Sequence, residues 1–172
     1  MDFQGIHDRL RAIQAPGIVG VDLPRPANPA DKKDKGRAGD PFVIVEATRI
    51  VDFLETCRDD VRLRFELLID LCGTDPAKDD ANLWVGYNLL SVAHRHRLSL
   101  KVLVPKAKAE LPSATPIYRA AQWHEREAGE MYGITFLDHP DPRNILLPDD
   151  WVGFPLRKDY EFPKEYHGIS CE

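Results

Sequence analysis

The sequence predicts an α+β fold: a mixed, largely antiparallel β-sheet with helices on one face, followed by an extended, proline-rich C-terminal arm. Segments with a helical period alternate with short apolar segments of period two, and three strand candidates follow one another with short links, which favours antiparallel pairing. The arm is predicted because five of the chain's 14 prolines lie between residues 140 and 163. Each proline removes a backbone donor and fixes φ, so neither a long helix nor a central strand is expected there.

Length and charge favour one domain with an appendage. A chain of 172 residues, 43% hydrophobic and 30% charged, is typical of a soluble globular domain. We expect an α/β domain over residues 1–133 and the arm over residues 134–172. The net charge of −5 is concentrated in the arm, which holds four basic and eight acidic residues. Such an acidic arm argues against nucleic-acid binding.

The N-terminal part is expected to hold a helix, a short strand and a loop. Apolar residues at helical spacing predict the helix, and Pro16 with Gly17 ends it; these apolar residues are Phe3, Ile6, Leu10 and Ile13. Residues 18–23 are a strand candidate. Residues 24–40 hold three prolines and mixed charges with no aliphatic residue larger than alanine, so we expect a flexible loop.

The middle of the chain continues with strands. Residues 42–45 are an apolar strand, and Thr48 is a candidate N-cap for a helix whose apolar stripe ends at Cys57. Residues 63–71 alternate between apolar and mostly polar side chains, which predicts a half-buried strand with Leu63, Phe65, Leu67, Ile69 and Leu71 on its apolar face. Residues 83–93 and 98–104 are two more strands, and the link 94–97 is expected to be a solvated hairpin tip.

The last predicted helix leads into the arm. Thr115 followed by Pro116 is a helix-start signal, and the helix is expected to run from about residue 117 to Gly133. The element order is therefore helix, strand, helix, three strands, helix and arm.

Catalytic equipment is not recognisable in the chain. His124 and Glu125 begin like the zinc motif HExxH, but residue 128 is alanine where the second histidine is needed. No glycine-rich phosphate loop is found, and three scattered cysteines cannot hold an iron–sulfur cluster. The longest nearly apolar run, residues 83–93, is shorter than the roughly 20 residues of a membrane span. These observations favour a cofactor-free binding or assembly module whose arm docks on a partner and whose membrane association is borrowed from that partner.

Five motifs stand in fixed order around the end of the last helix. They are Glu125-Arg126-Glu127, Glu130-Met131-Tyr132-Gly133-Ile134, His139-Pro140, Arg143-Asn144-Ile145-Leu146, and the block from Trp151 to Tyr160, WVGFPLRKDY. Together they resemble the C-type subunit of the proton-pumping NADH-quinone oxidoreductase, respiratory complex I, the 30 kDa subunit family. The resemblance is strongest from residue 122 to residue 168.

The resemblance implies a cofactor-free subunit of the peripheral arm of that complex. Its partners would be the large quinone-site subunit (D type) and the small iron–sulfur subunits (B and I types), with FMN and the iron–sulfur clusters held by partner subunits. NADH:quinone oxidoreductase activity would belong to the assembly, with no catalytic, cofactor-binding or metal-binding residue in this chain. The location would be peripheral, on the cytoplasmic side of a bacterial inner membrane. The alternative is the same subunit in a related ferredoxin-plastoquinone, F420H2 or membrane hydrogenase complex.

Carried over by residue, the resemblance implies ten partner-interface positions. Three would fix the junction of helix and arm, four would be polar anchors, and three would be apolar anchors. In that order they are Glu125, Arg126 and Glu127; His139, Arg143, Arg157 and Asp159; and Trp151, Phe154 and Tyr160. The other reading left open is that the helix and the first part of the arm fold back on their own domain.

Overall fold

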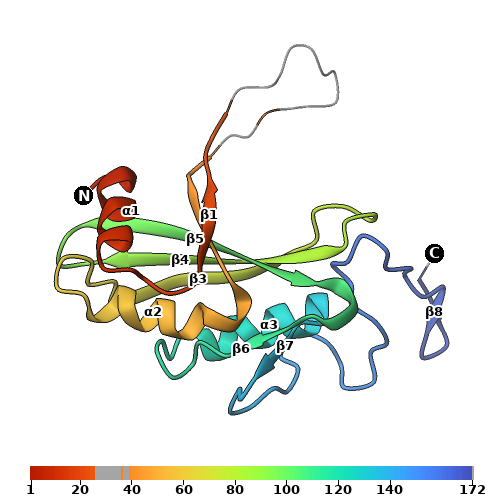
Figure 1. Ribbon diagram of the computed structural model, residues 1–172. Coiled ribbons are helices and arrows are strands. Elements are labelled where there is room, and N and C mark those ends of the chain that lie inside the picture. The colour runs from red at the N-terminus through yellow and green to blue at the C-terminus, as the bar shows by residue number, and fades with distance from the viewer. Residues whose placement is uncertain (26–35, 37–38, 172) are drawn as a thin grey trace.

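A five-stranded sheet is the centre of the molecule in the computed structural model, which describes residues 1–25, 36 and 39–171 (Figure 1). Its strand order is β1-β2-β5-β4-β3. The strands are β1 Ile18–Asp22, β2 Phe42–Val45, β3 Leu67–Thr74, β4 Asn82–Ser91 and β5 His96–Pro105. β2 pairs with β5 in parallel, and the other three pairs are antiparallel. The predicted mixed, largely antiparallel sheet is confirmed.

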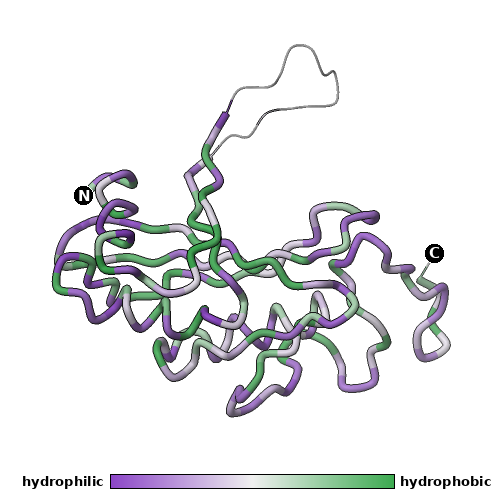
Figure 2. The backbone as a smooth tube through the Cα atoms, viewed as in Figure 1, coloured by the Kyte–Doolittle hydropathy of each residue, from purple (hydrophilic) through white to green (hydrophobic). Residues whose placement is uncertain are grey.

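Three helices cover this sheet. α2 (Ile50–Asp59) and α3 (Ala121–Tyr132) lie below the sheet in Figure 1, on the same face. α1 (Phe3–Ala12) packs at the end of the sheet, where Arg9 Nε donates to Asp60 Oδ1 at the end of α2 (3.2 Å). Alternate residues of β4 and β5 point into one shared hydrophobic core with Ile6, Phe53 and Phe65. In Figure 2 the sheet strands carry the main hydrophobic stretches of the chain.

The prediction for residues 63–71 is right for Leu63, Phe65 and Leu71, which are buried, and wrong for the middle of the segment. The strand begins only at Leu67, and Leu67 and Ile69 are 47% and 45% exposed, whereas Leu68 and Leu71 are buried. The pairing with β4 shifts between Leu68 and Asp70, as at a β-bulge. Because a shift of one residue exchanges the two faces of a strand, the bulge overturns a reading that assumed unbroken alternation.

Two predicted boundaries and one cap also differ. His96 belongs to β5 and is buried, with its Nε2 2.7 Å from Leu63 O, so the link 94–97 is not wholly a solvated tip. Thr48 lies in a 3-10 turn (Ala47–Arg49), where its hydroxyl donates to Glu46 and caps nothing. α3 starts at Ala121, after a series of turns, and not at residue 117.

After α3 the chain first returns to the core. A short parallel pair joins β6 (Glu110–Pro112) and β7 (Thr135–Leu137), and Ile134 and Phe136 are buried in the core. Residues 138–171, called the C-terminal segment below, then run past the end of α3 to a small hairpin, β8 (Glu165–Tyr166) and β9 (Ile169–Ser170) (Figure 1). The other short element is a 3-10 turn at Lys106–Lys108. The flexible loop expected at residues 24–40 falls mostly outside the described residues.

Candidate functional site

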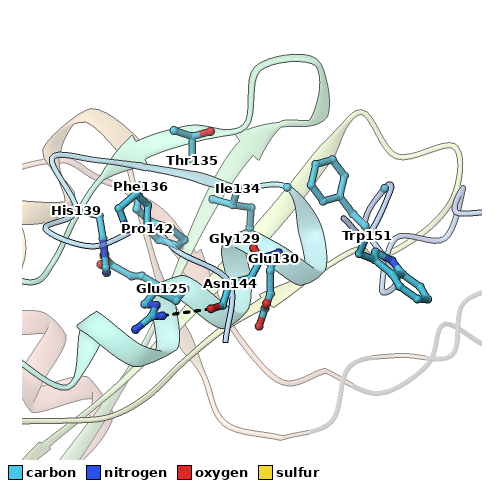
Figure 3. A pocket seen from close by; sticks show the side chains of 14 residues that line it. Glu125, Gly129, Glu130, Ile134, Thr135, Phe136, His139, Pro142, Asn144 and Trp151 are labelled. Carbon is cyan, nitrogen blue, oxygen red and sulfur yellow. Dashed lines mark hydrogen bonds and ion pairs between the residues drawn. The ribbon is translucent and has the colours of Figure 1, made fainter. Parts of the chain in front are cut away.

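The candidate site lies where α3 meets the C-terminal segment. A pocket of about 500 Å³ opens there between the helix, β7 and the segment (Figure 3). Glu125 and His139 lie at one end of the view, Glu130 is central, and Trp151 is at the other end. Five of the ten predicted interface residues line this pocket: Glu125, Arg126, His139, Trp151 and Phe154.

Glu125 is buried inside the domain, with 1% of its surface exposed. Its Oε2 accepts a hydrogen bond from Ser113 Oγ (2.6 Å), and its Oε1 accepts one from Ala114 N (2.6 Å). Burial raises the pKa of the Glu125 carboxyl to about 7, although both hydrogen bonds act in the opposite direction. Glu125 therefore ties α3 to the chain that follows β6, and it changes charge near neutral pH.

His139 attaches the start of the C-terminal segment to the first turn of α3. Its Nδ1 accepts from Asp141 N (3.0 Å), so Nε2 carries the proton and donates to Gln122 O (3.1 Å). Nε2 also lies 3.9 Å from Oε2 of Glu125. Both ring nitrogens of His139 are thus used within the chain.

Arg126 holds the next part of the segment. Its Nε donates to Arg143 O (2.7 Å) and its Nη2 to Asn144 O (3.3 Å), the latter marked by the dashed line in Figure 3. Asp141 lies 3.7 Å from the Arg126 guanidinium and accepts two hydrogen bonds from Arg143, at 2.7 and 2.9 Å. The Arg143 guanidinium holds the pKa of Asp141 at about 2.

Glu130 opens one of the five sequence motifs but was not among the predicted interface residues. Its carboxylate accepts hydrogen bonds from three successive backbone amides, Ile145, Leu146 and Leu147, at 3.0 to 3.2 Å. It is 7% exposed. Its partners lie 15 to 17 residues further along the chain, so no local spacing marks this role; the available signal was its place in the motif that ends α3.

Arg157 caps the C-terminal end of α3. Its Nε donates to Tyr132 O (2.6 Å) and its Nη2 to Gly133 O (3.5 Å), which places a cation where helix carbonyls lack partners. Its guanidinium lies 4.7 Å from the centre of the Phe154 ring. That ring lies on Gly133, whose φ of +68° ends the helix.

A second residue missed from the sequence is Asp75, just after β3. Its Oδ2 accepts from Lys158 N (2.9 Å), and its Oδ1 lies 2.8 Å from Lys106 Nζ. Burial acts to raise the pKa of Asp75, but the hydrogen bonds from Lys106 and Lys158 N outweigh burial, so the pKa of the Asp75 carboxyl is lowered. The charged carboxylate therefore fastens the C-terminal segment beside the sheet.

Trp151 at the far end of the pocket and the remaining predicted residues contact the outer part of the C-terminal segment or solvent. Trp151 contacts the rings of Phe162 and Tyr166, with centroids 5.8 and 5.3 Å apart, and the Tyr160 ring packs on Gly153. Glu127 and Asp159 are exposed, and neither makes a hydrogen bond or ion pair within the described part of the chain.

The arrangement is that of a clasp, with charged side chains holding backbone groups. Across the residues that the structure describes, no group of three or more His, Cys, Asp or Glu is placed to hold a metal ion. In the same residues, no helix is both long and apolar enough to cross a bilayer.

Comparison with known proteins places the site in a family context. The family model for the 30 Kd subunit of respiratory-chain NADH dehydrogenase matches residues 43–166, which include α3 and most of the C-terminal segment. The C-type subunit of the NADH-quinone oxidoreductase of Chloroherpeton thalassium is 47% identical over 134 residues, which cover 76% of this chain and 54% of that protein. Its counterpart in Roseiflexus castenholzii is 46% identical over 121 residues, which cover 70% of each. The aligned part thus spans between about half and 70% of these relatives.

Two solved structures have a similar fold. A trypsin-resistant fragment of Nqo5 matches with a TM-score of 0.54 and 23% identity, covering 82% of this chain and 99% of the fragment. A chain of the membrane-bound sulfane sulfur reductase, an archaeal respiratory membrane complex, matches with a TM-score of 0.64 and 21% identity, covering 94% of this chain and 86% of that one. At these identities the likeness is one of fold.

Proposed function

Because this chain belongs to the family of the 30 Kd subunit of respiratory-chain NADH dehydrogenase, we propose that it is the C-type subunit of a proton-translocating NADH-quinone oxidoreductase. It supports assembly and the quinone-site subunit, while the whole complex passes electrons from NADH to quinone. FMN and the iron–sulfur clusters belong to partner subunits. The observation that carries the proposal is the family match over the α3 junction and the C-terminal segment, the part of the chain with the most specific motifs.

The partners in this proposal are the large quinone-site subunit of the D type and the small iron–sulfur subunits of the B and I types. The complex would hold the chain on the cytoplasmic side of a bacterial inner membrane, without a membrane span of its own. The chain thus contributes to the oxidoreductase activity as a structural part and carries no active site.

The C-terminal segment supports a docking role through its outer surface. Glu130 and Asp75 hold its backbone against the domain, and the side chain of Arg157 binds the end of α3, yet Val152 and Phe162 remain 85% and 61% exposed. Large apolar side chains that stay in water on an anchored backbone are typical of an interface, because little conformational freedom is lost when a partner covers them.

The ten predicted interface residues then divide by role in this proposal. Those whose side chains bind backbone groups of their own chain set the shape of the segment. They are Glu125, Arg126, His139 and Arg157; Arg143 acts in the same way through the side chain of Asp141. The contact itself would be made by Glu127, Asp159, Trp151, Phe154 and Tyr160 with their exposed neighbours.

Assembly in the native host tests the proposal. Arg157→Ala and Phe162→Asp should lower the amount of assembled complex, measured on native gels, more than the NADH-dependent quinone reduction per assembled complex. Val61→Asp, an equally polar change at a 73% exposed site in the turn after α2, is the control and should assemble normally. Normal assembly of both variants with lost turnover would contradict an assembly role.

The electron donor separates the proposal from its alternative, the same subunit in a ferredoxin-plastoquinone, F420H2 or membrane hydrogenase complex. An N-terminally tagged chain purified from membranes in mild detergent should bring with it an iron-rich assembly that oxidises NADH. If this assembly instead prefers ferredoxin, F420H2 or hydrogen, the alternative holds.

A further inference from the structure

A second cavity lies far from the α3 junction, between α1 and β1. Its volume is about 490 Å³, within the range of about 300–1,000 Å³ that is typical of binding clefts. One stripe of α1 forms one wall, with residues at helical spacing, and β1 forms the other. We call this cavity the α1–β1 groove; it is lined by His7, Leu10, Arg11, Gln14, Ala15 and residues 18–21.

The α1 wall of the groove carries polar groups with unused hydrogen-bonding capacity. Only 7% of the His7 surface is exposed, yet its Nε2 has no hydrogen-bond partner among the described residues. Arg11, one turn further along α1, is exposed and forms no ion pair within the described residues. Buried polar atoms in native proteins almost always have partners, so this unpaired nitrogen leaves a hydrogen-bonding capacity that a ligand in the groove would satisfy.

The charge of the groove is complementary to a carboxylate. No Asp or Glu is among its lining residues, although the chain as a whole has a net charge of −5. Asp8, one turn before Arg11 on α1, is not a lining residue and accepts a hydrogen bond from Gln4, and Asp2 caps the helix start. A ligand that brings an acidic group would meet Arg11 and His7 without repulsion from the lining residues.

The β1 wall offers a backbone edge. β1 stands at the end of the strand order, and β2 is its neighbour in the described sheet. The hairpin of β1 and β2 projects away from the rest of the sheet (Figure 1), and Val19 is 69% exposed. An exposed edge strand with unpaired N–H and C=O groups is a template for an additional strand.

We propose that the α1–β1 groove binds an extended acidic segment of a neighbouring subunit, which adds as a strand to the edge of β1 and places a carboxylate at His7 and Arg11. The backbone edge supplies affinity, and the two basic side chains supply the preference for an acidic residue. This inference rests on the proposed function, because it takes its partner from the same assembly.

Site-specific photo-crosslinking in the purified assembly tests the inference. A photoreactive phenylalanine analogue replaces Val19 in the groove, Val152 in the C-terminal segment, or Val61 as an exposed control. From position 19 we expect one crosslinked segment of a co-purified subunit, extended and containing Asp or Glu. Position 152 reports separately on the docking of the C-terminal segment, and position 61 should give no comparable product.

Two substitutions sharpen this test. Arg11→Glu should lower the crosslink yield from position 19 by at least about tenfold, since like charges across an interface are strongly unfavourable, whereas Arg119→Glu, the same charge change before α3, should not. His7→Phe removes the unpaired nitrogen, so it should leave the thermal stability of the isolated chain equal or higher and still weaken the crosslink. If His7 were only structural, His7→Phe would lower or raise the thermal stability and the crosslink yield together.

The outcomes separate the two proposals. Crosslinks from position 152 but none from position 19 overturn the groove inference and leave the proposed function standing. The groove inference is also overturned if position 19 crosslinks to a second copy of this chain, to another part of the same chain, or to a segment that lacks acidic residues. A chain that purifies without any assembly overturns both.

Discussion

Replacing Glu130 is the most direct perturbation of the clasp between α3 and the C-terminal segment. The carboxylate accepts from three backbone amides at 3.0 to 3.2 Å and is 7% exposed. Hydrogen bonds to a charged group contribute roughly 1.5–3 kcal/mol each. The three bonds share one carboxylate and are not additive, so we expect Glu130→Ala to lower the free energy for local opening of the segment by about 3 kcal/mol.

This magnitude corresponds to about a hundredfold faster exchange, since each 1.36 kcal/mol is a factor of ten. Hydrogen–deuterium exchange at the amides of Ile145, Leu146 and Leu147 measures it directly. Glu130→Gln keeps one acceptor oxygen and should show a smaller increase, and Glu127→Ala on the exposed side of α3 should show none. Wild-type exchange rates at the three amides in Glu130→Ala would refute the assignment of the carboxylate as the anchor.

Three further predictions concern the glycine cap, a titrating acid and a buried thiol. Gly133→Ala should lower the free energy of unfolding by roughly 1–3 kcal/mol, because φ is +68° and the new Cβ would lie 2.5 Å from the Phe154 ring; thermal unfolding measures this, with Gly20→Ala, which meets no atom within 4 Å, as the control. Burial raises the pKa of Glu125 from 4.5 to about 7, so its contribution to stability is present below pH 4.5 and is lost as the pH rises to 7. The loss in the free energy of unfolding is up to roughly 3 kcal/mol. In urea unfolding, the stability difference between Glu125→Gln and wild type should therefore change between pH 4.5 and 7, and a constant difference would contradict this prediction. Burial also raises the pKa of the Cys57 thiol, so a thiol reagent should label Cys57 only after unfolding, whereas labelling in the folded chain at the rate of the exposed thiols would show that the core opens there.

The candidate site was only partly predictable from the sequence. Arg126 was expected to fix the junction of helix and arm, and His139 and Arg157 were expected as polar anchors; each has a defined place at the junction. Their hydrogen bonds go to carbonyl groups of the same chain, and backbone carbonyls have no signature in a sequence. The reading in which the first part of the arm folds back on its own domain describes these contacts; whether the same residues also face a partner is a proposal.

The sequence by itself determined the three helices, the mixed sheet and the family, although the predicted element order counts one strand before the second helix where the structure has β1 and β2. Apolar periodicity reports which segments have a buried side, and the fixed spacing of motifs from Glu125 to Tyr160 is specific enough to identify relatives. Both properties are local or linear along the chain, so they can be recognised before the chain is folded.

The tertiary structure alone decided which side of β3 faces the core and which acids hold the C-terminal segment. A bulge after Leu68 exchanges the two faces of that strand, and one irregular residue cannot be distinguished from regular alternation in a sequence. Glu130 and Asp75 bind amides 15 and 83 residues away. A carboxylate becomes an anchor only when folding brings unpaired backbone donors to it and removes water from both, and these two conditions depend on the packed structure.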